Sequence, residues 1–245
     1  MTCPSPAERA RTLLRGRLPG LLFLDDVAVP LPVRHGTDHA GQPLLLVPAA
    51  GGLREALRAR GPVGPGGVLR VDDVPPSADA PSLGRARASG RLHPVDPGES
   101  STAAALEFAT ANPLPSLLGV GTEAVLYRLH LTGVHLVSDQ GGGPLDPAEY
   151  AAAEPDPLHE AERDLLLDLA DHHVDELEPW FRTALGSAGI EAEHPRAARL
   201  DRYGFTVDTG RPRRRWVRLD FARPLDTVDE LAQLLHPVLF HPHVS

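Results

Sequence analysis

Between Arg85 and Leu92 the sequence alternates at every position, which restricts the backbone more than any other stretch of the chain. Arg85, Arg87 and Arg91 lie on one side of this alternation, and the other side carries Ala86, Ala88, Gly90 and Leu92. A period of two is that of a β-strand, where successive side chains point to opposite faces. The stretch therefore predicts a strand with one apolar face and one face lined by arginines.

Other extended runs surround this strand, and only short helical patterns separate them. They are LPGLLFLDD (18–26), PLPVRHGTDHAGQPLLLVP (30–48), VLRVDDV (68–74) and AVLYRLHLTGVHLV (124–137). Turn residues 39–43 join two runs into a hairpin, and Gly133 is expected to mark a bulge. The order lacks the strand–helix alternation of a parallel doubly wound sheet. We therefore expect an α+β fold that begins with a small barrel over residues 1–150.

The region 139–158 is rich in Gly, Pro and acidic residues and is expected to link this barrel to a second domain over 156–245. That domain opens with a helix over 159–189, whose apolar stripe includes His173 and Phe181. Two strands, 197–210 and 213–224, form a hairpin, and a closing helix over 227–236 begins at Thr227, with Glu230 completing a capping box. The predicted order of elements in the second domain is therefore helix, strand, strand, helix.

Composition excludes several classes of function. The formal charge of −9 argues against a general nucleic-acid binder, which needs a basic footprint. The single cysteine, Cys3, excludes an internal disulfide framework, and no apolar run reaches the roughly 20 residues of a membrane span. An arginine-rich start precedes LPGLLFL, but Pro19 and Gly20 interrupt that run and no cleavage site follows. These features predict a cytoplasmic protein.

Two clusters could carry chemistry. The guanidinium groups of Arg85, Arg87 and Arg91 could hold phosphate or carboxylate groups, and the alternative is an ordinary solvated sheet face. On the first helix of the second domain, Asp168, His172 and Glu176 recur four residues apart, which suits either a divalent metal or solvated charges. A glycine pattern at Gly119–Ala124 lacks the strand-then-helix setting of a dinucleotide site.

The chain ends in LLHPVLFHPHVS, which places His236, His241 and His243 within its last ten positions. Histidine is a common axial ligand of haem iron, so this tail could supply one. The alternative is an ordinary disordered chain end.

Several of these stretches together resemble a known family. DHAGQPLLLVP, the strand through ASGRL, the helix ending ANP and the strand VLYRLHLTGVHLV resemble the flavin-type split β-barrel, like that of flavin reductases and pyridoxamine-phosphate oxidases. HEAERDLLLDLADHHVDEL, ARLDRYGFTVD and RRRWVRLDFARPLDTVDELAQLL look like the small α+β domain fused to such barrels. This arrangement resembles the bacterial haem-utilisation haem oxygenases of the HugZ type, and the chloroplast relative that binds glutamyl-tRNA reductase.

The resemblance implies a homodimeric split barrel that binds haem through a histidine near the C-terminus. His241 best suits that role, with His243 and His236 as alternatives, and Arg85, Arg87 and Arg91 would then contact haem propionates or a flavin phosphate. The alternatives are an FMN-dependent oxidoreductase and a non-enzymatic regulator that senses tetrapyrrole or binds a partner. Flavin-binding members follow the PLLLVP-like strand with Ser and a His-Thr pair, where this chain has PAAGGLREAL.

Overall fold

The computed structural model describes the chain except residues 1–2, 26, 59–63, 97, 140 and 241–245. The chain divides into two compact units, a barrel unit (5–74 and 82–155) and a C-terminal unit (1–4, 75–81 and 156–245). The segment Pro75–Pro81, which leaves the barrel between two of its strands, thus belongs to the C-terminal unit.

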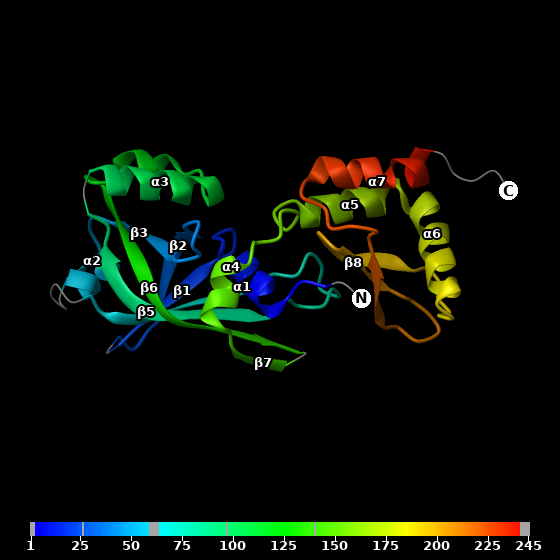
Figure 1. The fold of residues 1–245 in the computed structure, drawn as a ribbon, viewed down its shortest axis with the longest axis horizontal. Coiled ribbons are helices and arrows are strands. Elements are labelled where there is room, and N and C mark those ends of the chain that lie inside the picture. Colours follow the sequence, from blue (N-terminus) through cyan, green and yellow to red (C-terminus); the bar gives the residue numbers. More distant parts are fainter. Residues whose placement is uncertain (1–2, 26, 59–63, 97, 140, 241–245) are drawn as a thin grey trace. The chain divides into compact units, whose positions relative to one another are not determined.

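The barrel unit holds most of the strands (Figure 1). Its elements are α1 (Pro6–Leu14), β1 (Gly20–Leu24), β2 (Leu31–Thr37), β3 (Pro43–Pro48), α2 (Gly52–Arg58), β4 (Gly66–Asp72), β5 (Arg85–Pro94), α3 (Glu99–Ala111), the 3₁₀ helix η1 (Pro115–Gly119), β6 (Ala124–Ser138), β7 (Gly141–Pro144) and α4 (Pro147–Ala152).

The antiparallel sheet runs in the order β3-β2-β1-β4-β5-β6-β7, and an additional β3–β6 pairing closes its first six strands into a barrel. In that closing pair Leu46 lies opposite Leu126. The expected α+β fold with an antiparallel barrel is confirmed. The short strand β7 and helix α4 lie in the region expected to be a linker, so the barrel unit extends further than the composition suggested.

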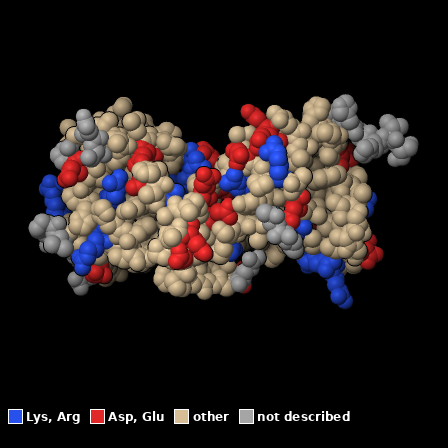
Figure 2. All heavy atoms as spheres, in the orientation of Figure 1, with Lys and Arg blue, Asp and Glu red and all other residues tan. Residues whose placement is uncertain are grey.

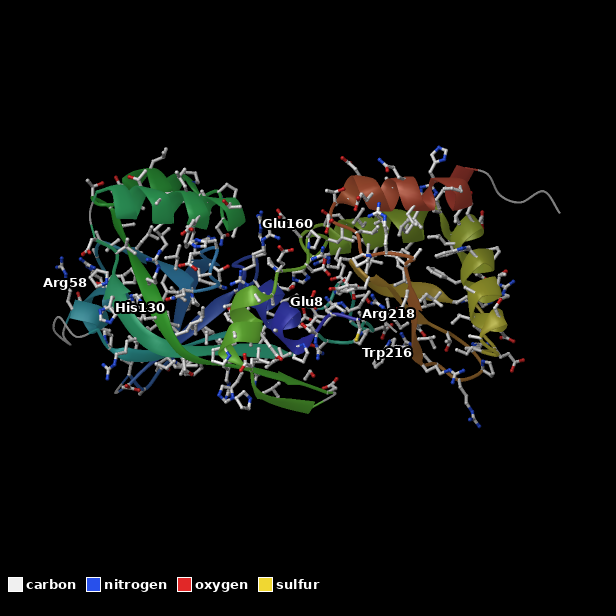
Figure 3. All side chains as sticks on the ribbon, in the orientation of Figure 1. Glu8, Arg58, His130, Glu160, Trp216 and Arg218 are labelled. Atoms are coloured by element: carbon white, nitrogen blue, oxygen red, sulfur yellow. The ribbon has the colours of Figure 1, made fainter. Side chains whose placement is uncertain are left out.

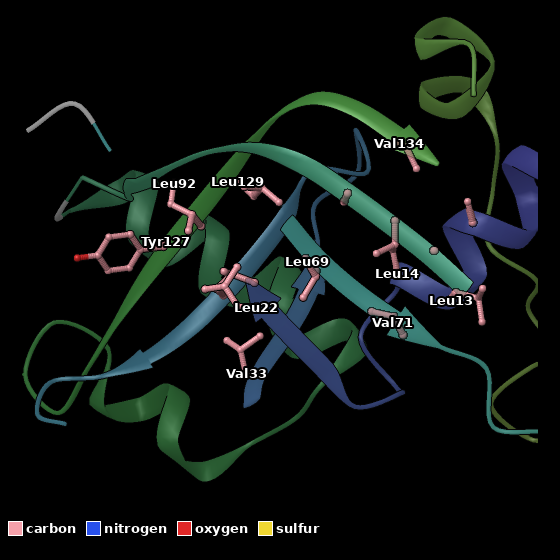
Figure 4. Packing of buried hydrophobic residues seen from close by; sticks show 14 of the residues in the cluster. Leu13, Leu14, Leu22, Val33, Leu69, Val71, Leu92, Tyr127, Leu129 and Val134 are labelled. Carbon is pink, nitrogen blue, oxygen red and sulfur yellow. The ribbon is translucent and has the colours of Figure 1, made fainter. Parts of the chain in front are cut away.

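The barrel interior is packed with side chains rather than hollow. Leu22, Val33, Leu69, Leu92 and Leu129 point inward from different strands, and Leu13 and Leu14 of α1 join the same cluster (Figure 4). Strand β5 contributes only small residues, Ala86 and Ala88, along much of its length. At Gly90 an added Cβ would lie 2.2 Å from the carbonyl oxygen of His130, so the two strands approach closely there.

The register between β5 and β6 shifts between Ser89 and Gly90, where Ser89 pairs with Gly133 and Gly90 with Leu131. This is the bulge that Gly133 was expected to mark. Because one extra residue on β6 changes which side chains face outward, the bulge decides which β6 residues stand beside the arginines of β5.

The C-terminal unit contains α5 (Glu162–His172), α6 (Val174–Ser187), β8 (Arg196–Asp201), β9 (Gly204–Asp208), β10 (Trp216–Asp220) and α7 (Val228–Phe240). Its three strands form a sheet in the order β10-β9-β8. The core contains Phe181 and Phe205, whose rings meet edge to face at 5.5 Å between centroids, together with Leu200 and Leu235.

Two helix boundaries differ from the sequence expectation. The helix expected over 159–189 is broken at His173, whose φ of −131° leaves helical geometry, and Leu169 is buried before the break. The closing helix continues past Pro237 to Phe240, because Val238 and Leu239 pack against the core. There the packing of apolar side chains outweighs the loss of one backbone hydrogen bond. Within the described residues, every helix is too short or too polar to cross a membrane.

Candidate functional site

The arginines of β5 lie on the outer face of the barrel, as their alternation predicted. Ala86, Ala88 and Leu92, each of which directly follows one of these arginines, are buried. Arg87 is exposed and stands opposite Arg70 of β4 and His135 of β6. Arg85 is ion-paired with Asp72 of β4, whose other oxygen lies 3.0 Å from Arg70 Nε, so the charge of Arg85 is partly balanced. The three arginines are therefore unequal as sites for an anion.

Arg91 belongs to a compact group that the sequence did not reveal. We call Arg91, His93, Arg128 and His130 the outer-face cluster. The first two come from β5 and the last two from β6, and the register pairs Arg91 with His130 and His93 with Arg128. The two imidazole rings meet edge to face at 5.1 Å between centroids. Four basic or imidazole groups thus share one patch of the barrel surface.

Electrostatics in this cluster favour binding of a negative charge. The pKa of His130 is lowered, first by partial burial and then by the nearby His93 and Arg128. An anion placed among these groups would counter that mutual repulsion and raise the pKa of His130. The cluster is therefore chemically suited to carboxylate or phosphate groups.

Acidic residues border the cluster on one side. Arg128 Nε lies 3.2 Å from Asp38 Oδ2, and its Nη2 lies 4.0 Å from Glu107 Oε2. His39 Nδ1 lies 2.7 Å from Glu107 Oε1, and this hydrogen bond and the charge of Glu107 raise the pKa of His39. These carboxylates hold Arg128 in place, and Arg91 Nη1 donates to the Gly64 carbonyl at 3.3 Å. The two imidazoles and the other donors of Arg91 remain as the open part of the cluster.

A separate pocket of about 400 Å³ opens beside β1 and β2. Its lining includes Arg17, Arg34, His35 and Asn112. Asn112 donates from its side-chain amide to the carbonyl oxygens of Gly16 and His35, which fixes this corner of the barrel. The His35 ring itself is buried, and within the described residues neither ring nitrogen has a hydrogen-bond partner. Burial lowers the pKa of His35 to about 4, so the ring is neutral at pH 7.

The predicted histidine ligands lie at the end of the C-terminal unit. His236 is exposed on α7 and borders a shallow depression together with Ala232, Gln233 and Pro237. His241 and His243 lie outside the described residues, so their role stays a prediction.

A metal site on the helix face was the other possibility raised by the sequence. His172 Nδ1 lies 3.2 Å from Asp168 Oδ1, but both side chains are more than half exposed. Among the described residues, no group of three or more His, Cys, Asp or Glu side chains could hold a metal ion. Asp168 and His172 therefore behave as a solvated helix pair.

The sequence matches no family model and no curated protein. Comparison with solved structures gives one likeness over the whole chain and weaker partial ones. A heme binding protein from Mycobacterium smegmatis is 23% identical, with a TM-score of 0.69 over 95% of each chain. Campylobacter jejuni ChuZ is 11% identical, with a TM-score of 0.44 over 59% of this chain and 61% of that one. An FAD binding protein from Mycobacterium smegmatis is 15% identical, with a TM-score of 0.38 over 58% of this chain and 98% of that one. The first likeness spans both units and shows a shared fold.

Proposed function

We propose that this chain binds haem, with a histidine of the C-terminal tail as the iron ligand and arginines of the barrel's outer face as contacts for the propionates. The observation that carries the proposal is the likeness over 95% of both chains to a structure described as a heme binding protein. It covers the C-terminal unit as well as the barrel, and the tail histidines follow directly from that unit.

The side chains present fit haem in their chemistry. A neutral imidazole is a common axial ligand of haem iron, and guanidinium groups pair with carboxylates in planar, two-bond contacts. His241 is the proposed ligand, with His243 and His236 as the alternatives. His236 shows that an imidazole of this segment is presented on the surface of α7.

The arginines have distinct proposed roles. Arg91, supported by His93 and Arg128, is the best propionate contact because the outer-face cluster concentrates several donors in one place. Arg87 is the second, because it is exposed and lies beside Arg70. Arg85 contributes less, since it is paired with Asp72.

Oxidative degradation of the bound haem is a further part of the proposal. Haem would supply the iron centre for oxygen chemistry, with O₂ and electrons from an external donor. The protein's own part would be to fix the porphyrin by its propionates and hold the iron through imidazole. A homodimer formed through the barrel is part of the same proposal, and light scattering of the purified protein measures it.

Hemin titration tests the binding proposal. The purified protein is titrated while the Soret band is followed, and wild type is compared with His241→Ala, His243→Ala and His236→Ala. We expect saturation at one hemin per chain and loss of the shifted band in one variant only. Hemin binding that does not saturate, or that is the same as wild type in all three variants, would refute ligation by the tail.

Two additions to the same experiment separate the alternatives. Ascorbate added to the hemin complex should bleach the Soret band if the chain degrades haem, and a stable band would instead indicate a tetrapyrrole-sensing protein. Titration with FMN in place of hemin tests the flavin alternative. Tight FMN binding with no specific hemin binding would replace the haem proposal.

A further inference from the structure

The loop between β9 and β10 carries an unusual concentration of charge for a chain with a net charge of −9. We call residues Asp208–Trp216 the arginine tip; it contains four arginines and one aspartate. One of these arginines, Arg214, serves as an anchor. Its Nη2 lies 2.7 Å from Asp208 Oδ2 and 3.2 Å from Asp79 Oδ2, and the Asp208 side chain is only 3% exposed.

Hydrogen bonds to the backbone connect the rest of the tip. The Thr209 amide donates to the Arg215 carbonyl at 3.0 Å, and the Thr209 hydroxyl donates to the Arg213 carbonyl at 2.9 Å. Glu193 and Arg211 exchange two backbone hydrogen bonds of 2.9 and 3.2 Å. The tip is therefore organised before any partner arrives, which reduces the entropy lost on binding.

The remaining charges point to solvent. In the described part of the chain the guanidinium groups of Arg211, Arg213 and Arg215 have no ion-pair partner, and all three residues are exposed. Basic side chains extend from this unit beyond the surrounding surface in Figure 2. Trp216, labelled in Figure 3, follows directly and is 52% exposed. A rigid loop thus presents three unpaired cations beside an indole.

An open sheet edge adjoins the tip. Among the described residues β10 pairs with β9 alone. At the two ends of β10 the Thr209 amide donates to the Arg215 carbonyl and the Phe221 amide donates to the Tyr203 carbonyl. Since every second residue of a strand bonds to the same neighbour, Val217 and Leu219 also bond to β9. Because bonding direction alternates in an antiparallel pair, the backbone groups of Trp216 and Arg218 face the open side. This edge can accept a further strand.

We infer that the edge of β10 and the arginine tip together bind an extended acidic segment of a partner protein. The segment would pair with the backbone of Trp216 and Arg218 as a fourth strand, with its carboxylates on Arg211, Arg213 and Arg215 and an apolar side chain against the indole. The positive charge of the three arginines favours an acidic partner. The open backbone edge favours a peptide over a nucleic acid, because a nucleic acid has no backbone amides to pair with a strand. This site is independent of haem binding.

The test uses the full-length protein and an acetylated decapeptide of alternating Glu and Val. Fluorescence follows binding, since Trp216 is exposed while the chain's other tryptophan, Trp180, packs against Phe181 and Phe205. We expect saturable binding that weakens as salt rises. Replacing Arg211, Arg213 and Arg215 together by Ser should weaken binding about tenfold, at the modest strength of exposed ion pairs.

A matched control removes the same charge elsewhere. Arg34, Arg58 and Arg163 are also exposed, and changing all three to Ser should leave peptide binding unchanged. Two further peptides carry N-methyl groups on alternate amides, one set on each edge of the peptide strand. Only the set that faces β10 should abolish binding, because it removes the ladder donors.

Three outcomes would overturn the inference. The acidic peptide could fail to bind, or both N-methylated peptides could bind as well as the parent, which would mean that charge alone attracts it. A ten-nucleotide oligothymidylate could bind more tightly than the peptide and lose that binding in the triple-arginine variant, which would assign the tip to nucleic acid instead.

Discussion

Arg199 and Glu162 form a two-bond ion pair inside the C-terminal unit, with Arg199 Nε 2.9 Å from Oε1 and Nη2 2.7 Å from Oε2. Both side chains are at most 6% exposed. Glu162 also accepts the Leu200 amide at 2.9 Å, and Arg199 Nη1 donates to the Pro81 carbonyl at 3.0 Å. Burial alone would raise the pKa of Glu162, but hydrogen bonds from His159 and Arg199 outweigh it and lower that pKa to about 2. The pair ties α5, β8 and the segment Pro75–Pro81 into one unit.

Glu162→Ala should therefore destabilise the C-terminal unit severely. It leaves the buried guanidinium of Arg199 without its counter-charge, which costs about 3–5 kcal/mol for ion pairs of this kind. Urea unfolding followed by circular dichroism measures the loss. Arg182→Ala, which breaks the exposed pair with Glu178, is the control and should cost less than about 1 kcal/mol. Equal losses of unfolding free energy in the two variants would show that the buried pair stabilises the unit no more than an exposed pair does.

His35 should make the barrel unit sensitive to acid. Its folded-state pKa of about 4 lies below its usual value of 6.5, because burial disfavours the charged ring. Between those values the unfolded chain binds the proton more readily, so stability is full above pH 6.5 and falls as the pH drops toward 4. The shift corresponds to about 3 kcal/mol.

The variant His35→Leu isolates this effect, because it keeps a side chain of similar size and removes the titrating group. The free energy of unfolding should depend less on pH in the variant than in wild type between pH 6.5 and 4. Parallel pH profiles for the two proteins would contradict the assignment to His35.

Gly41 should tolerate no side chain. Its φ is +79°, and an added Cβ would lie 1.5 Å from Arg11 Nη1. Arg11 cannot move away cheaply, because its guanidinium stacks on the Tyr150 ring at 5.4 Å and donates to the His39 carbonyl at 3.1 Å. Gly51 has a φ of +109° but nothing within 4 Å of such a Cβ. Gly51→Ala should lower the free energy of unfolding by about 1–2 kcal/mol through the backbone alone. Gly41→Ala should lower it further, and thermal unfolding of the two variants measures the difference.

The unequal surroundings of the β5 arginines predict unequal effects on hemin binding. Arg91→Ala should weaken hemin binding severalfold, because Arg91 stands in the outer-face cluster. Arg85→Ala should have the smaller effect, since the ion pair with Asp72 already engages that guanidinium. Soret titrations at low and high salt compare the two variants. A larger effect at Arg85 would show that the cluster is not the propionate contact.

Much of the barrel could be predicted locally. The alternation from Arg85 to Leu92 places the arginines outside and the small residues inside, because one face of an antiparallel strand is buried. Val33 and His35 share a face for the same reason. That the His35 ring is buried depends on the neighbouring strand, where Gly20 leaves room for it. An added Cβ on Gly20 would lie 2.7 Å from His35 Nδ1.

The strands and the faces of their side chains can be predicted from the sequence, because they follow from the local periods of apolar residues. The alignment of distant strands depends on the folded barrel. Closure of the barrel pairs Leu46 with Leu126, and the bulge near Gly133 sets Arg91 beside His130. A slip of one residue in that register would turn His130 to the other face, since strand side chains alternate with a period of two. The outer-face cluster forms because packing across the whole barrel fixes that alignment. The sequence pattern of either strand alone does not predict it.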